Sequence, residues 1–249
     1  MKKTLYFFFS IFTWLIMVVL ALIFMPFQLL LFFLTVLFDK HRRLMHYHGS
    51  LYVTLALMLT PIMKLKIEGW ENLDRSKSHV VIMNHQSLID ILLVFRLFYP
   101  VKMIGKKILA MIPIVGWDIF LAGHIFVDRS SRKSQFRAIR RMEKILKTGD
   151  SLLVFPEGTR TTDGEIQKFR RGGFRAATET GTPVLPVVID GAFQALPKST
   201  VTVDRKHTVR ISIMPPVPVE EKEDMGELAG RCQQLMTAEL ARMRSENLD

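Results

Sequence analysis

The sequence predicts an α/β fold with a central mixed, mostly parallel sheet flanked by helices, preceded by a membrane-embedded helical hairpin. From Lys66 onward, apolar runs of four to six residues alternate with helical stretches, which is the pattern of successive βα units. Before that point, no charged residue occurs between Thr4 and Phe38. We therefore divide the chain into a membrane-embedded and interfacial helical segment at residues 1–65 and an α/β domain at residues 66–249.

The apolar stretch from Leu5 to Phe38 is too long for one crossing and too short for two. One straight helix would reach about 50 Å against a hydrocarbon core of about 30 Å, whereas two crossings need roughly 40 residues. Pro26 divides the stretch, and basic residues at both ends favour a cytoplasmic location for both ends. We expect a hairpin that dips into one leaflet rather than a single tilted span. The flanking residues are Lys2, Lys3, Lys40, Arg42 and Arg43.

A second apolar segment, residues 51–65, is interrupted by Pro61 and is too short for a confident span, so we expect it on the membrane surface or packed on the domain. The α/β domain that follows has short apolar runs that predict strands at Val80–Met83, Val101–Ile104, His124–Val127, Leu152–Phe155, Val184–Ile189 and Thr208–Met214. Helices are predicted at Leu88–Phe98, Ile108–Leu121 (broken by Pro113 and Gly116), Lys133–Lys147, Gly173–Thr180 and Asp224–Arg244.

The net charge of +11 and the isoelectric point near 9.9 indicate an anionic partner. Nucleic acid, a phospholipid surface, a phosphorylated substrate and an acidic carrier protein all fit, and composition does not choose among them. The single cysteine, Cys232, excludes a disulfide framework and a cysteine-based zinc site. Ligand-type residues do not cluster at metal-site spacing, so we expect no metal and no resident cofactor.

His85 and Asp90 stand in a turn between a predicted buried strand and a predicted helix, with Ser87 as a possible N-cap. A histidine outside the helix and an aspartate in its first turn can meet, which gives a base that removes a proton from a hydroxyl and a carboxylate that orients it. The alternative is a capping box formed by Ser87 and Asp90, which requires no catalytic role.

Residues 155–160 follow another predicted strand and therefore emerge at the carboxyl edge of the sheet, where α/β folds collect their sites. Arg160 offers a planar fork for a phosphate, and Glu157 can orient it or accept from a substrate hydroxyl. Taken alone, the segment fits a surface turn with an ion pair better than a binding site. Arg129 and Lys106 follow two further strands and bring cations to the same edge, whereas His124 fits a packed strand histidine better than a second base.

In order and spacing, these segments resemble the four motif blocks of the glycerolipid acyltransferase family, and most closely its bacterial branch that acylates 1-acyl-sn-glycerol-3-phosphate. The resemblance covers roughly residues 67–217. It rests on Asn84 through Asp90, Lys106 with Pro113 and Gly116, Gly123 through Arg129, Phe155 through Arg160, and Val184 through Val187. For the last of these blocks, a buried strand with a shaping proline fits as well as contact with the acyl donor.

The resemblance implies transfer of a fatty acyl group from a thioester to the sn-2 hydroxyl of lysophosphatidic acid, which gives phosphatidic acid. It makes His85 the general base and Asp90 its orienting carboxylate. It assigns Arg129 and the block containing Glu157, Gly158, Thr159 and Arg160 to the acceptor, while a phosphate contact by Lys106 is our inference. The implied partners are the lipid bilayer, lysophosphatidic acid, and acyl-CoA or acyl carrier protein as co-substrate, with no nucleic acid. The implied location is the cytoplasmic side of a bacterial inner membrane.

Several points stay open at this stage. No Gly-x-Ser-x-Gly elbow is present, so direct transfer is simpler than an acyl-enzyme, and the amides after His85 are candidate oxyanion donors. The basic helix at residues 133–147 is a solvated face or a contact for headgroups or a carrier protein, and residues 108–117 are a wall for the acyl chain, ordinary core or a membrane-touching loop. The remaining functional alternatives are acylation of another lysophospholipid or an ornithine lipid, and a non-enzymatic basic membrane-binding module.

Overall fold

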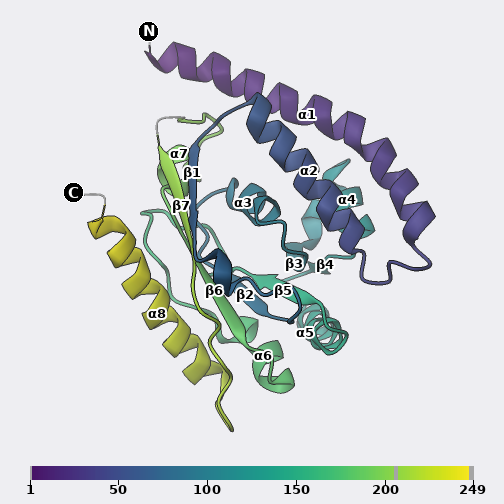
Figure 1. The fold of residues 1–249 in the computed structure, drawn as a ribbon, viewed down its shortest axis with the longest axis vertical. Helices are drawn as coiled ribbons and strands as arrows, with labels where there is room; N and C mark the ends of the chain where they lie inside the picture. The colour runs from purple at the N-terminus through teal and green to yellow at the C-terminus, as the bar shows by residue number, and fades with distance from the viewer. Residues whose placement is uncertain (1, 205–206, 247–249) are drawn as a thin grey trace.

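The structure is a computed structural model that describes residues 2–204 and 207–246. Two long helices, α1 (Lys2–Thr35) and α2 (Arg43–Leu59), pack on each other and lie across one side of an α/β domain (Figure 1). The described residues of that domain form a seven-stranded sheet in the order β1-β7-β6-β2-β5-β3-β4. Its strands are β1 (Lys64–Glu68), β2 (Val80–Met83), β3 (Val101–Lys106), β4 (Ile125–Val127), β5 (Ser151–Val154), β6 (Val184–Asp190) and β7 (Thr208–Ile213).

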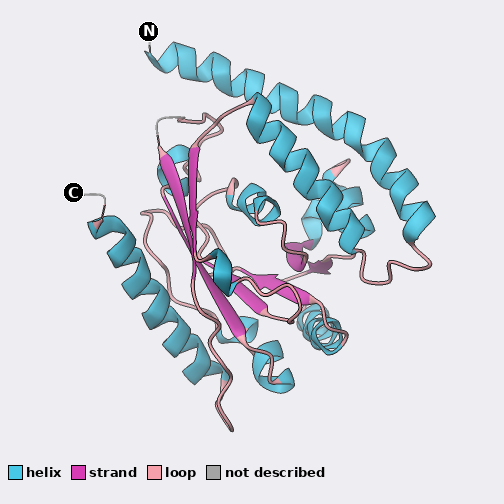
Figure 2. Ribbon diagram, in the orientation of Figure 1, coloured by secondary structure: helices cyan, strands magenta, loops and turns pink. Residues whose placement is uncertain are grey.

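All neighbouring strands are parallel except β6 and β7, which confirms the predicted mixed, mostly parallel sheet. Helices cover both faces of it (Figure 2). The remaining helices are α3 (Asp90–Arg96), α4 (Val115–Leu121), α5 (Arg132–Lys147), α6 (Arg175–Thr180), α7 (Ala192–Ala195) and α8 (Met225–Ser245), with short 3₁₀ turns η1 (Trp70–Asn72), η2 (Lys107–Met111) and η3 (Arg171–Gly173).

Two buried apolar clusters explain this layering. One contains side chains from α5, α6 and α8 and the facing side of the central strands, and the other contains side chains from α3 and α7 and the opposite side of the same strands. The strands β2, β5 and β6 are buried along their whole length, as expected for parallel strands that are covered on both faces. The block at residues 184–187 is therefore a buried strand, with Pro186 in register with Ile82.

A helical hairpin precedes the domain as predicted, but its arms are α1 and α2. The predicted division of residues 5–38 at Pro26 is wrong, because Pro26 lies inside a helix that continues to Thr35. An apolar helix tolerates a proline, since breaking it would expose further backbone groups without solvent to satisfy them. The chain reverses at residues 36–42 instead, where the Asp39 carboxylate accepts hydrogen bonds from the backbone N–H groups of Arg43 and Leu44 and so starts α2.

The helix α1 is long and apolar enough from Tyr6 to Thr35 to cross a membrane, judged by length and composition. Much of its apolar surface is nevertheless exposed, while contacts distributed along it reach the rest of the chain. Tyr52 Oη donates to the carbonyl of Met17, and Gln28 donates to the Asp118 carboxylate on α4. The side chains of Lys2 and Lys3, the first residues of this helix, lie outside the described part.

The prediction missed two elements. The strand β1 pairs with β7 at the sheet edge. Exposed charged residues alternate along it with half-buried apolar residues, and it begins within the apolar segment at residues 51–65, so it has no apolar run of its own. The one-turn helix α7 follows β6 and is too short for a periodic pattern. The segment expected on the surface or on the domain packs on α3, as the C-terminal part of α2.

Candidate active site

The side chains of His85 and Asp90 meet directly after β2, as the sequence predicts. His85 Nδ1 lies 2.8 Å from Asp90 Oδ2. The same oxygen accepts hydrogen bonds from the backbone N–H groups of Gln86, at 2.7 Å, and Ser87, at 2.8 Å. Because an amide N–H can only donate, Oδ2 acts as an acceptor, and the His85 ring carries its proton on Nδ1. This tautomer leaves Nε2 with the free lone pair that a general base requires.

The two side chains of the pair differ in their exposure to solvent. The Asp90 side chain is fully buried, whereas the His85 side chain is 18% exposed. Burial raises the pKa of Asp90, and the bonds from His85, Ser87 and Gln86 oppose that rise. Asp90 is the first residue of α3, where a carboxylate also benefits from the positive end of the helix dipole. The geometry fixes the imidazole and exposes one edge of it.

The turn after β5 holds His85 from the other side. Glu157 is buried, and its carboxylate accepts the backbone N–H of His85 at 2.8 Å and that of Gln167 at 3.1 Å. The Phe155 ring stacks on the His85 imidazole with centroids 4.1 Å apart. Burial raises the pKa of Glu157 to about 7, with a smaller contribution from the Asp90 charge. Glu157 therefore holds the backbone of His85, and neither Glu157 nor Arg160, which were expected to line one cleft, is among the residues that line the cavity described next.

A cavity of about 700 Å³ opens directly after Glu157 in the same turn. Gly158 and Thr159 line it, and cations reach it from three other places in the chain. Its cationic residues are Lys106 and Lys107 after β3, Arg129 after β4, and Arg170 before η3. These strand ends lie at the carboxyl edge of neighbouring strands, where α/β sheets form ligand sites. An anionic group is the natural occupant.

Two arginines frame the Gly158 turn. Arg129 Nη1 donates to the Gly158 carbonyl, and Arg170 packs against the Gly158 α-carbon, where a β-carbon would lie 2.8 Å from Arg170 Nε. Gly158 adopts φ +72°, a conformation that favours glycine. Burial lowers the pKa of Arg129, and the neighbouring Arg170 lowers it further, since each disfavours the other's charge. An anion that binds between them would relieve this repulsion.

The region that carries this site is similar in sequence and structure to known proteins. A sequence model of the acyltransferase family matches residues 64–190, from β1 through β6. The chain belongs to the acyltransferase family. It is 35% identical to a 1-acyl-sn-glycerol-3-phosphate acyltransferase of Chlamydomonas reinhardtii over 77% of this chain and 58% of that one. It is 29% identical to the enzyme of the same name from Escherichia coli, over 76% of this chain and 78% of that one.

The crystal structure of the 1-acyl-sn-glycerophosphate acyltransferase PlsC from Thermotoga maritima superposes with a TM-score of 0.86 at 28% identity, and covers 98% of both chains. The helical pair α1 and α2 is thus part of the shared fold as well. The chain spans a little over half the length of the chloroplast and algal relatives it matches, 58% of the Chlamydomonas reinhardtii protein and 54% of one from Arabidopsis thaliana.

The structure places the remaining predicted residues with mixed success. Lys106 and Arg129 line the cavity as expected, and so does Lys107. Thr159 lines it too, whereas Arg160 is half-buried and does not. His124 is a packed strand histidine, as predicted, with Nδ1 accepting the backbone N–H of Met103.

Two further expectations concern the donors for an oxyanion and the apolar stretch after β3. The amides of Gln86 and Ser87 are not free to stabilise an oxyanion, because both donate to Asp90. The apolar stretch after β3 is not ordinary core, since Ile108, Met111 and Trp117 are exposed, and the first two line the cavity. Among the described residues, no group of three or more His, Cys, Asp or Glu side chains is arranged to hold a metal ion.

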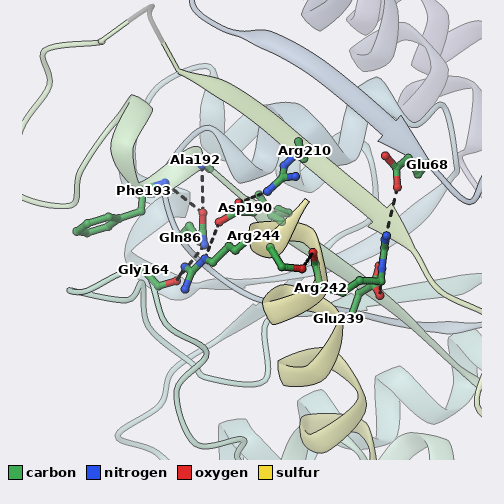
Figure 3. A network of polar contacts seen from close by, with 12 residues as sticks. Glu68, Gln86, Gly164, Asp190, Ala192, Phe193, Arg210, Glu239, Arg242 and Arg244 are labelled. Carbon is green, nitrogen blue, oxygen red and sulfur yellow. Dashed lines mark hydrogen bonds and ion pairs between the residues drawn. The ribbon is translucent and has the colours of Figure 1, made fainter. Parts of the chain in front are cut away.

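Sequence reasoning missed the residues whose hydrogen bonds hold the His85 turn in place. The Gln86 amide donates to the carbonyl of Gly164 and accepts the backbone N–H groups of Ala192 and Phe193, which ties the His85 turn to α7 (Figure 3). Arg244 from α8 donates to the same Gly164 carbonyl and to Asp190. The position of Gln86, one residue after the histidine, was the available signal. Arg170 had none, since it follows no predicted strand.

Proposed function

We propose that this protein transfers a fatty acyl group from a thioester to the sn-2 hydroxyl of lysophosphatidic acid, giving phosphatidic acid for phospholipid biosynthesis. The observation that carries the proposal is an oriented imidazole, His85 on Asp90, beside a cavity lined by Lys106, Arg129 and Arg170. A base for a hydroxyl and a cationic site for a phosphate monoester are the two things that such an acceptor requires. Relatives from bacteria and plastids that are named for this activity support the choice.

The chemistry follows from the tautomer. The sn-2 hydroxyl donates its proton to His85 Nε2 while its oxygen attacks the thioester carbonyl carbon, which forms a tetrahedral oxyanion. Asp90 stabilises the resulting imidazolium through Nδ1. The oxyanion then expels the thiolate as the carbon–sulfur bond breaks, and the imidazolium returns its proton to the thiolate. The new carbon–oxygen bond forms and the carbon–sulfur bond breaks in a direct transfer, without an acyl-enzyme intermediate.

The acceptor's phosphate would lie between the cations of the cavity. Arg129 and Arg170 approach the Gly158 turn from two elements, and a phosphate dianion between them offsets the unfavourable proximity of their charges. Lys106 and Lys107 extend the positive lining on the side of β3. We assign the acceptor contact to Arg129, Gly158 and Thr159 with Lys106, and to Arg170 in place of Arg160.

The acyl chains require a lipid surface nearby, and the chain supplies an apolar one. Exposed apolar residues cover α1 and continue over η2 and α4, including Phe33, Met111 and Phe120. Because α1 also contacts the domain through Trp14 and Gln28, we propose that it lies in one leaflet beside the cavity rather than crossing away from it. Basic residues at both ends of α1 favour the cytoplasmic leaflet of a bacterial inner membrane.

An assay with purified protein in detergent micelles tests the proposal. Lysophosphatidic acid, lysophosphatidylcholine and glycerol-3-phosphate are each offered with acyl-CoA and with acyl carrier protein, and the products are identified by mass spectrometry. Phosphatidic acid from lysophosphatidic acid is the expected product. Acylation of lysophosphatidylcholine alone, or no transfer to any acceptor from either donor, would overturn the assignment.

A further inference from the structure

Residues 196–203, between α7 and β7, form a short loop that touches three functional parts of the protein; we call it the strap. At its start, the carbonyl of Leu196 accepts a 2.6 Å hydrogen bond from the Ser87 hydroxyl, in the turn that carries His85. Near its end, the strap is bound to α1. Trp14 Nε1 donates to the carbonyl of Val201 at 2.8 Å, and the backbone N–H of Val203 donates to the Ser10 hydroxyl at 2.9 Å.

Between these anchors the strap delivers one cation to the turn after β5. Lys198 Nζ lies 3.2 Å from Thr159 Oγ1 and 3.3 Å from the carbonyl oxygen of Arg160. Thr159 lines the cavity. Both contacts are long and go to neutral oxygens, and in the described part of the chain no carboxylate forms a salt bridge with Lys198. A lysine held only for structure would be expected to neutralise an acid, whereas this ammonium keeps its charge available beside the cavity.

The chemistry of the acceptor explains why a cation at this place matters. In lysophosphatidic acid the sn-2 hydroxyl and the phosphate are separated by only two carbons and one ester oxygen. When the hydroxyl reaches His85, the phosphate must therefore lie close to the His85 turn. The cations that line the cavity come from β3 and the segments that follow β3 and β4 and precede η3, while the strap is bonded to the His85 turn itself through Ser87.

Given the proposed function, we propose that Lys198 is an acceptor-binding residue that contacts the phosphate monoester of the lysophosphatidic acid. The helix α1 holds it in place through Trp14 and Ser10. On this account the helix that meets the lipid also positions a cation of the acceptor site, so the strap links the membrane-facing element to substrate recognition. Loss of either the cation or its tether weakens acceptor binding and leaves the base untouched.

The test compares K198Q, K198R and the tether variant W14F with the wild-type protein at saturating acyl donor. K198Q is expected to raise the KM for lysophosphatidic acid about tenfold, as for loss of one charge-assisted hydrogen bond, with kcat within about twofold. K198R should recover most of that loss. W14F should raise KM in the same direction by a smaller factor, because it removes the indole N–H donor while the bond between Ser10 and Val203 remains. Melting temperatures verify that each variant folds.

K77Q is the matched control, since Lys77 is an exposed lysine before β2, at the opposite edge of the sheet, and its KM should equal that of the wild type. An unchanged KM in K198Q, or a fall in kcat without a change in KM, overturns the inference while the proposed function stands. Absence of phosphatidic acid with the wild-type protein overturns the proposed function, and this inference with it.

Discussion

Replacing Asp90 by asparagine separates the charge of the dyad from its geometry. The asparagine oxygen can occupy the Oδ2 position, where it still accepts the N–H groups of Gln86 and Ser87 and the Nδ1–H of His85. The amide nitrogen then takes the place of Oδ1, a buried atom without a hydrogen-bond partner among the described residues. The histidine therefore keeps its tautomer and orientation and loses only the negative charge that stabilises the imidazolium.

The expected loss follows from Coulomb's law. With Nδ1 and Oδ2 2.8 Å apart, the charge centres of the imidazolium and the carboxylate lie about 4 Å apart, which is worth about 4 kcal/mol at an effective dielectric constant of about 20. Asp90→Asn should therefore lower kcat about a thousandfold and leave the KM for lysophosphatidic acid nearly unchanged.

Stability should move in the other direction. The carboxylate is fully buried, so a neutral amide of the same shape removes a desolvation cost, and the urea midpoint should hold or rise. Steady-state kinetics and urea denaturation on the same preparation measure both effects. A kcat within tenfold of wild type would refute the role of the charge, and a parallel loss of stability would mean that Asp90 is a structural residue.

Two further predictions concern the turn after β5. Burial raises the pKa of Glu157 to about 7 in the folded protein, against an ordinary value near 4.5. The protonated carboxyl therefore contributes about 3 kcal/mol of stability below pH 4.5, and this contribution is lost as the pH rises through 7. Urea midpoints should fall from pH 4 to pH 8, and Glu157→Gln should reduce this pH dependence. Gly158→Ala places a β-carbon 2.8 Å from Arg170 Nε at φ +72°, which should cost roughly 1–2 kcal/mol in unfolding free energy and raise the KM for the acceptor. An alanine variant with wild-type KM and midpoint would show that Arg170 has room to move.

Most strands of the sheet could be predicted from the sequence because they are buried on both faces. Val80–Met83 is an unbroken apolar run, and Val184–Ile189 is apolar with one proline, Pro186; such runs predict central parallel strands directly. The edge strand β1 lacks this signal, since lysines alternate along it and its partner β7 lies far away in sequence. The turn of the hairpin was misplaced at Pro26 because a proline is a strong signal in water and a weak one in an apolar helix.

The sequence predicted site residues that lie close together in the chain. It did not predict those that reach the site through tertiary contacts. His85 and Asp90 are five positions apart, and their meeting required only one turn and one helix start. Glu157 was assigned to the cleft because it follows a strand at the carboxyl edge of the sheet, yet its carboxylate is buried by the pairing of β2 with β5, which brings it to the backbone of His85. Arg170 and Lys198 reach the site from loops whose paths no local pattern predicts.

The central claim is that His85 is the base that activates the acceptor hydroxyl, and one variant tests it most directly. His85→Ala is compared with wild type for phosphatidic acid formation from lysophosphatidic acid and an acyl thioester, in single-turnover reactions with enzyme in excess. Loss of the reaction by at least about a thousandfold, with wild-type melting temperature and lysophosphatidic acid binding, is the predicted result. Phosphatidic acid formation at a tenth of the wild-type rate or faster would contradict it.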